Sequence, residues 1–198
     1  MGDPKRPKRK YSRPSHPWQR ARIEEEKEIV KEYGILRKTE IWKMNSKLKR
    51  YKKQAKRLIT SATSQAEIEK KQLMDALIKL NLIKENATLD DVLSLKLKDL
   101  LERRLQTIVF KKGLARTVKQ ARQFIVHGHI MIKDHKQSSP SHLVVYDQEV
   151  EVTFNALSTL ADEEHPERKD AEVKKELIKE HEKINPPKQE VVEIKGEQ

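Results

Sequence analysis

The first third of the chain carries the pattern of amphipathic helices. Residues 23–33 are strongly charged and end at Gly34, a residue that readily takes the left-handed conformation found after a helix end. Beyond Thr39, apolar residues recur at alternating spacings of three and four, as on one face of a helix. They are Ile41, Met44, Leu48, Tyr51, Ala55 and Leu58. The pattern predicts two helices, the second with one continuous apolar face.

Two signals of helix starts follow. In a capping box, a Ser or Thr side chain accepts a backbone N–H, and a polar side chain three residues later reaches back to the cap. Ser64 and Glu67 have this spacing and precede an apolar run, and Thr88 and Asp91 are placed to start another short helix. We therefore expect a helical domain over residues 23–93.

The next segment combines two further helix patterns. Ser94 is placed to cap a helix that continues to Lys112. Thr117 and Gln120 form another capping box, and Gly128 offers the stop. We expect two helices joined by a turn.

Helical phase places the apolar and polar residues of these two helices on opposite sides. The apolar sides hold Leu97, Leu101, Leu105 and Ile108 of the first helix and Val118, Ala121, Phe124 and Ile125 of the second. The polar sides hold Arg103, Arg104, Thr107 and Lys111 of the first helix and Lys119, Gln123 and His127 of the second, flanked by Arg116 and Gln120, with Arg122 at the margin. We expect each helix to bury its apolar side and to expose its cations.

Short β-like runs follow at residues 130–133, 143–145 and 150–154, where apolar and β-branched residues alternate or cluster. Two helices followed by a small curled sheet make residues 94–155 a module of their own. Together with the helical domain over 23–93, this predicts the α+β fold class.

The two ends of the chain lack these patterns. Residues 1–22 contain four prolines among basic residues, which predicts an extended basic arm. Residues 156–198 mix Glu and Lys around a thin apolar stripe, which predicts an acidic, mixed-charge tail that is partly disordered or helical.

The charge is unevenly distributed along the chain. Of 198 residues, 43 are Lys or Arg and 31 are Asp or Glu, which gives a formal net charge of +12. The excess lies in residues 1–60 and 103–145, whereas 146–198 is acidic. Two positive blocks predict two contacts with a polyanion, foremost a nucleic acid, because bound cations release counterions from phosphates. In the first block, the cations that we expect on phosphates are Lys43, Lys47, Arg50, Lys53 and Arg57.

Several kinds of site are excluded by the residue types. The chain has no cysteine, which rules out disulfides, thiolate zinc sites and a cysteine nucleophile. No apolar run has the length of a membrane span or a signal peptide, so we expect an intracellular protein without a membrane partner. His127 and His129 could form a metal pair, but contact with phosphate is the preferred interpretation. No catalytic constellation stands out, and we expect no enzyme activity, no metal and no cofactor.

Several short stretches stand out in combination. They are residues 103–107 (RRLQT), 120–123 (QARQ) and 127–130 (HGHI), supported by 16–19 (HPWQ), 32–34 (EYG), 139–141 (SPS) and 165–167 (HPE). Together they resemble the family of small-subunit ribosomal protein four, in its archaeal and eukaryotic-cytosolic branch and in particular its archaeal members. The resemblance covers most of residues 1–167 and implies an RNA-binding module at about 95–155 behind a helical domain.

The resemblance also implies a function. It is that of a structural component of the small ribosomal subunit, in the cytoplasm, which binds small-subunit ribosomal RNA directly, nucleates assembly of the 5′ domain and contributes to translational accuracy. The implied protein neighbours are small-subunit ribosomal proteins two, three and five. The RNA-facing residues carried over by position are Arg103, Arg104, Arg116, Thr117, Lys119, Gln120, Arg122, Gln123, His127 and His129, to which helical phase adds Lys111. The chain departs from the family pattern at 134–135 and 146–148, where the turns of the sheet are expected.

Two alternatives use the same module. A small nucleolar ribonucleoprotein subunit would process ribosomal RNA precursors, but the archaeal-like end motifs argue against it. An RNA-modification factor such as a pseudouridine synthase or a methyltransferase would need a further catalytic domain, for which the chain leaves no room.

Overall fold

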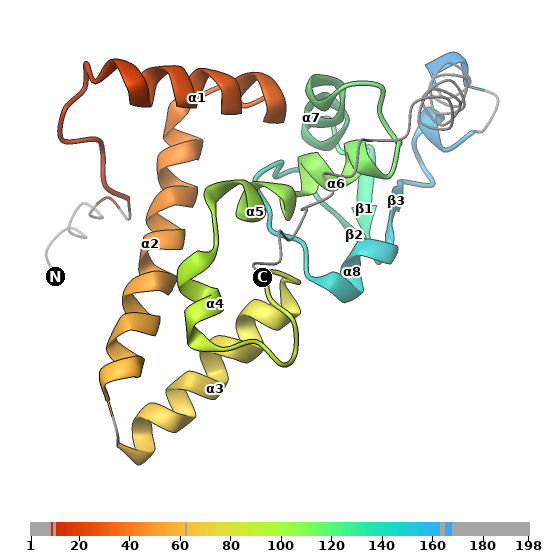
Figure 1. Ribbon diagram of the computed structural model, residues 1–198. Coiled ribbons are helices and arrows are strands. Elements are labelled where there is room, and N and C mark those ends of the chain that lie inside the picture. The colour runs from red at the N-terminus through yellow and green to blue at the C-terminus, as the bar shows by residue number, and fades with distance from the viewer. Residues whose placement is uncertain (1–8, 10, 62, 163–164, 168–198) are drawn as a thin grey trace, which may run out of the picture.

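The N-terminal part of the protein is built around one long helix. The computed structural model describes residues 9, 11–61, 63–162 and 165–167. The helices of this part are α1 (Arg20–Tyr33), α2 (Lys38–Thr60), α3 (Ser64–Lys79), α4 (Leu89–Ser94) and α5 (Leu97–Glu102). Helix α1 crosses the start of α2, α3 turns back from its far end, and α4 and α5 pack along it (Figure 1). Most of the predicted arm is described, whereas residues 1–8 and the tail from 168 to 198 lie outside the described residues.

The sequence pattern predicted this part well. Gly34 takes φ 57° directly after α1, as expected for a left-handed helix end. Of the six predicted apolar positions of α2, five are buried, and Tyr51 is half-buried. The capping box of Thr88 and Asp91 is confirmed, and the Thr88 N–H donates to the Asp91 carboxylate at 2.7 Å. The cap of α3 was predicted one residue late, because Thr63, and not Ser64, accepts the N–H of the first turn.

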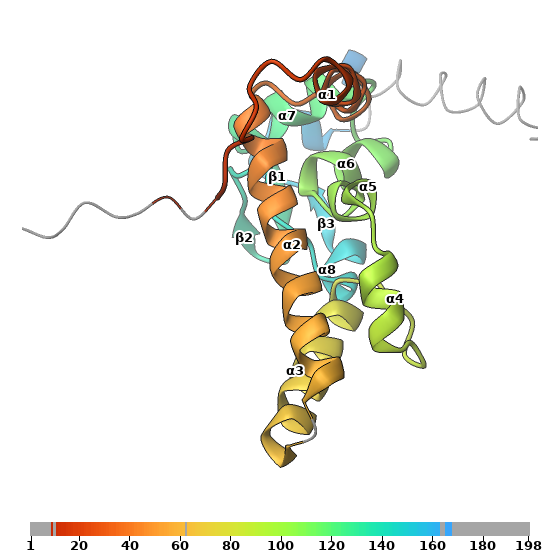
Figure 2. The ribbon, with the colours of Figure 1, turned by 60° about the vertical axis from the view of Figure 1, so that its left-hand side comes forward.

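The second part joins short helices to a small sheet. Its elements are α6 (Leu105–Lys111), α7 (Val118–Val126), β1 (Ile130–Ile132), β2 (His135–Lys136), α8 (Tyr146–Val150), β3 (Val152–Phe154) and the 3₁₀ turn η1 (Thr159–Ala161). The strands pair antiparallel in the order β2-β1-β3, with Met131 opposite both Lys136 and Thr153. Helices α6 and α7 pack against each other beside this sheet (Figures 1 and 2), and Arg104 before α6 and Arg122 of α7 contact Glu40 near the start of α2. The predicted α+β class is confirmed.

The predicted single helix over 94–112 is wrong. Ser94 ends α4, its hydroxyl donates to the Asp91 carbonyl, and the chain breaks again at Arg104, where ψ is 141°. At this break the backbone pairs with a distant segment. The Leu105 N–H donates to the His142 carbonyl at 2.8 Å, and Val144 donates to the Arg103 carbonyl at 3.0 Å. A long-range β-like pairing therefore replaces the helical hydrogen bonds that local sequence favours.

The same pairing explains two other differences. Residues 143–145 form only an isolated bridge, Arg104 with Leu143, because their partner is a helix break and not a strand. Residues 146–150 form α8 where a turn and a strand start were expected, and Val150 is 81% exposed. Only 152–154 joins the sheet.

Two hydrophobic clusters form the core. The first joins α1 to α5 and includes Leu48, Leu77 and Leu100, whereas the second joins α6, α7 and the sheet and includes Ile108 and Ile125. The change from one to the other falls between residues 101 and 105, later than the predicted domain boundary at residue 94. Among the described residues, no helix combines the length and the apolar character of a membrane span.

Candidate nucleic-acid interface

The basic face predicted on α2 is present. Four of its five predicted cations are exposed, namely Lys43, Arg50, Lys53 and Arg57. Lys47 is half-buried, and burial together with the neighbouring Arg50 charge lowers the pKa of Lys47. Of these five cations, only Arg57 forms an ion pair among the described residues, and its partner is Glu69 of α3. The apolar side of α2 packs on α4 and α5, so the cations are left facing outward.

Helix α7 also presents the side that was predicted. Lys119, Gln123 and His127 are exposed, whereas Ala121 and Ile125 are fully buried. Half of the capping box predicted at the start of α7 is present. Thr117 Oγ1 accepts the Gln120 N–H at 3.1 Å, but the Gln120 side chain accepts the N–H of Arg116, at 2.7 Å, and not that of Thr117.

The expectation that Arg103, Arg104 and Thr107 face solvent is wrong. They are 8%, 1% and 6% exposed, because the break after α5 changes the helical phase on which the expectation rested. The Arg103 guanidinium donates to Glu149 at 2.7 Å, and the Thr107 hydroxyl donates to the Leu101 carbonyl at 2.8 Å. Lys111 is exposed as expected and pairs with Glu102 at 3.0 Å.

Glu40, near the start of α2, joins the two parts of the protein. Its carboxylate accepts from Arg104 at 2.5 Å and from Arg122 of α7 at 2.9 and 3.2 Å. Burial alone would raise the pKa of Glu40, but the hydrogen bonds and charges of the two arginines outweigh burial and lower it. We call these three residues the Glu40 cluster. It ties the start of α2 to α6 and α7.

A second contact, which is uncharged, joins the end of α1 to α6 and α7. The buried Gln106 amide donates to the carbonyls of Gly34, at 3.3 Å, and Val118, at 2.9 Å. A Cβ on Gly34 would lie 3.1 Å from the Val118 side chain and 3.2 Å from the Gln106 amide nitrogen. The left-handed conformation and the tight space both favour glycine here.

A carboxylate occupies the N-terminal end of the α7 surface. Glu167 accepts from the Arg116 guanidinium at 2.5 Å and from the Gln120 amide at 2.6 Å. The hydrogen bond from Arg116 is the main reason that the pKa of Glu167 is lowered. Sequence reasoning assigned a role neither to Glu167 nor to Glu40. For Glu167 the only signal was its place in the 165–167 stretch.

Comparison with known proteins identifies the family. A family model described as the S4 domain matches residues 103–149. The small ribosomal subunit protein uS4 of Methanococcus aeolicus is 50% identical over 172 residues, which make up 86% of this chain and 97% of that protein. The chain belongs to the uS4 family. The uS4 of Methanococcus maripaludis strain S2 is 48% identical over 169 residues, 85% of this chain and 95% of that protein.

The uS4 assignment confirms the resemblance seen in the sequence, including its archaeal character. Both uS4 relatives are named as ribosomal proteins, which confirms that the chain is not an enzyme. The S4 match begins at Arg103, where the chain leaves the first hydrophobic cluster, and ends within α8. Within the uS4 chain, the matched stretch thus holds α6, α7, the β1-β2 hairpin and the segment that pairs with the helix break.

The two histidines of the uS4 module differ in their surroundings. The rings of His127 and His129 stack with centroids 6.1 Å apart, and His129 Nδ1 lies 2.7 Å from Ser158 Oγ. Burial, followed by the charges of His127 and Lys136, lowers the pKa of His129. Among the described residues, no group of three His, Asp or Glu side chains could hold a metal ion.

Proposed function

We propose that this uS4 family member is a structural component of the small ribosomal subunit that binds small-subunit ribosomal RNA directly. The observation that carries the proposal is the exposed basic face of α2 together with the exposed polar side of α7, which carries Lys119, both held in one geometry by the Glu40 cluster. Phosphate contacts position a protein on RNA, and the amides and histidines of α7 suit base edges and sugar hydroxyls. Membership of the uS4 family supports the same function and a place in the cytoplasmic ribosome.

The proposed RNA contacts are the predicted residues that are exposed or half-buried and that do not belong to the Glu40 cluster. They are Lys43, Lys47, Arg50, Lys53 and Arg57 of α2, and Lys111, Arg116, Thr117, Lys119, Gln120, Gln123, His127 and His129 of the module. Arg103, Arg104 and Arg122 have protein partners within the fold, and we assign them the task of holding the module. These three arginines support RNA binding indirectly, because they hold the residues that contact RNA in place.

The finer parts of the proposal rest on the family resemblance. They are nucleation of the assembly of the 5′ domain, a contribution to translational accuracy, and contacts with small-subunit ribosomal proteins two, three and five. A protein that holds two RNA surfaces at a fixed distance can order separate RNA segments, which supports a role in assembly. The uS4 relatives do not favour the two alternatives, a nucleolar ribonucleoprotein subunit and an RNA-modification factor.

The proposal predicts that RNA affinity depends steeply on salt and that single exposed cations of α7 contribute to this dependence. RNA affinity for the 5′ domain of small-subunit ribosomal RNA should fall strongly between low and moderate salt, because several phosphates are neutralised. Lys119→Ala should reduce the salt slope by about one unit and change the free energy of unfolding by no more than about 0.5 kcal/mol. Filter binding over a salt series measures the affinity and its salt slope, and chemical denaturation measures the free energy of unfolding. Lys70→Ala removes another exposed cation, from α3, and should leave RNA affinity unchanged. Parental binding by Lys119→Ala would mean that the α7 side is only solvated.

Glu167 is expected to compete with RNA. In Glu167→Gln the carboxylate that holds Arg116 and Gln120 loses its charge, so RNA phosphate meets less competition. Affinity for the same RNA should rise by about threefold, the size expected of an exposed ion pair. Glu32→Gln neutralises an exposed carboxylate paired with Lys98 and serves as the charge control. An unchanged or weaker affinity would show that Glu167 supports the bound state.

A further inference from the structure

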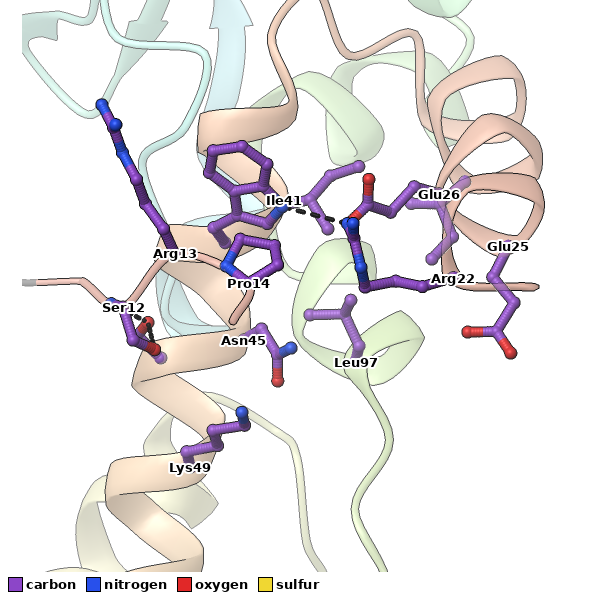
Figure 3. A pocket seen from close by; sticks show the side chains of 13 residues that line it. Ser12, Arg13, Pro14, Arg22, Glu25, Glu26, Ile41, Asn45, Lys49 and Leu97 are labelled. Atoms are coloured by element: carbon purple, nitrogen blue, oxygen red, sulfur yellow. Dashed lines mark hydrogen bonds and ion pairs between the residues drawn. The ribbon is translucent and has the colours of Figure 1, made fainter. Parts of the chain in front are cut away.

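A pocket lies outside the S4 module, between the arm, α1, α2 and the start of α5. Its volume is about 170 Å³ (Figure 3). The arm that forms one wall is tied at both ends, since the Ser12 N–H donates to Ser46 Oγ at 3.1 Å and the Arg22 guanidinium donates to the Pro17 carbonyl at 2.7 Å. The pocket is therefore a built part of the fold and not a gap beneath a loose segment.

The aromatic wall of this pocket has a fixed orientation. The indole of Trp42 lines it, and Nε1 donates to the buried Glu26 carboxylate at 3.0 Å. Glu26 also pairs with Arg22 at 2.5 Å and with Lys38 at 3.0 Å. Burial would raise the pKa of Glu26, but the hydrogen bonds from Trp42, Lys38 and Arg22 outweigh burial and lower it, so the acceptor stays ionised. The hydrogen bond thus fixes the orientation of the half-buried indole in the pocket wall.

The polar groups around the indole are not used by the fold. Within the part of the chain that the structure describes, Arg13, Glu25, Asn45 and Lys49 line the pocket without a hydrogen bond or an ion pair. Figure 3 shows Asn45 between Pro14 and Leu97, with Lys49 one turn further along α2. A carboxamide both donates and accepts, as base edges do, whereas the two cations suit phosphates.

This combination distinguishes between possible ligands. An acidic peptide could pair with the two cations and hydrogen-bond Asn45 through its backbone, but its carboxylate side chains offer no planar ring to stack on the indole. A single-stranded nucleotide uses all three, by stacking of the base, by hydrogen bonds to its edge and by contact with its phosphates. Lys53 and Lys56 continue the exposed row of Lys49 along α2, which offers a path for the adjoining phosphates.

We propose that the pocket between the arm and α2 binds one unstacked nucleobase of the ribosomal RNA, with Asn45 on the base edge and Arg13 and Lys49 on the flanking phosphates. The inference rests on the proposed function, because it assumes an RNA ligand. It adds a base-contacting site to the phosphate contacts of α2 and lies outside the residues that match the S4 domain.

The fluorescence of Trp42 tests the proposal in the full chain. Trp18 is the only other tryptophan and is 89% exposed, so Trp18→Phe leaves one reporter and an intact fold. A short oligoriboadenylate should quench Trp42 in a saturable way, because a stacked adenine covers the indole. Asn45→Ala should weaken this binding by about tenfold, the loss typical of a base-edge contact. Asn86→Ala, at an exposed site outside the pocket, should have no effect.

Four comparisons decide the outcome. An abasic oligomer of the same length and a polyglutamate peptide should leave Trp42 unquenched. Equal quenching by the abasic oligomer would replace the base site with a phosphate site, and equal quenching by polyglutamate would indicate a protein partner. An Asn45→Ala variant that binds like its parent would also overturn the proposal. If Trp42 does not respond while the 5′-domain RNA still binds, the pocket proposal fails alone, whereas loss of both responses would reject the proposed function.

Discussion

Replacing Glu40 by alanine is expected to destabilise the protein by about 3 kcal/mol. The variant leaves Arg104, with a 1% exposed side chain, without the carboxylate that compensates its charge. Two buried nitrogens of Arg104, Nε and Nη1, already lack a hydrogen bond among the described residues. No other acceptor that the structure describes is therefore at hand to replace the Glu40 carboxylate. Removing one member of a buried charged group costs far more than removing an exposed one, because the remaining charge stays desolvated. Chemical denaturation followed by circular dichroism measures the loss.

An exposed pair provides the control for Glu40. Glu24→Ala breaks the pair of Arg20 and Glu24, whose side chains are 91% and 56% exposed, and should cost less than about 1 kcal/mol. The pH dependence gives a second check. Because the pKa of folded Glu40 is lowered, its contribution is complete above the ordinary carboxyl pKa and is lost as pH falls through the lower folded value. The difference between the parent protein and Glu40→Ala should therefore shrink in acid, and a difference independent of pH would contradict the assigned charge.

The elements that local sequence could predict are those held by local contacts. The apolar face of α2 was predicted residue by residue, because helical period alone decides which side chains lie together. The Thr88 cap and the left-handed Gly34 were predicted for the same reason. The helix break at Arg104 could not be predicted from local sequence. It forms because residues 142–144, far along the chain, take the backbone hydrogen bonds of Arg103 and Leu105.

The arginines show the limit most clearly. Arg103 and Arg104 were expected to contact RNA because of their charge. In the fold, Arg103 forms an ion pair with Glu149 and Arg104 forms one with Glu40. The partners of Glu40 lie 64 and 82 residues away in sequence, and no local pattern marks such a pair. Three stretches that carry the family resemblance, 32–34, 103–107 and 120–123, meet at this joint. A resemblance identifies the family, but only the packing divides its polar residues between RNA contact and support.

Ala121→Asp is expected to unfold the S4 module. Ala121 is fully buried in the cluster that joins α6, α7 and the sheet, beside Leu105 and Ile108. A carboxylate placed there has no cation in that cluster to pair with, and its desolvation costs several times the stability that a small module can spare. Thermal unfolding should show the early loss of the module, and RNA affinity should fall as a consequence.

Gln123→Asp introduces the same side chain two residues later, on the exposed side of α7, and should change stability by no more than about 0.5 kcal/mol. Lys119→Ala should weaken RNA binding without unfolding, whereas Ala121→Asp should weaken it through unfolding. A variant that melts like its parent would mean that the buried side of α7 is assigned wrongly.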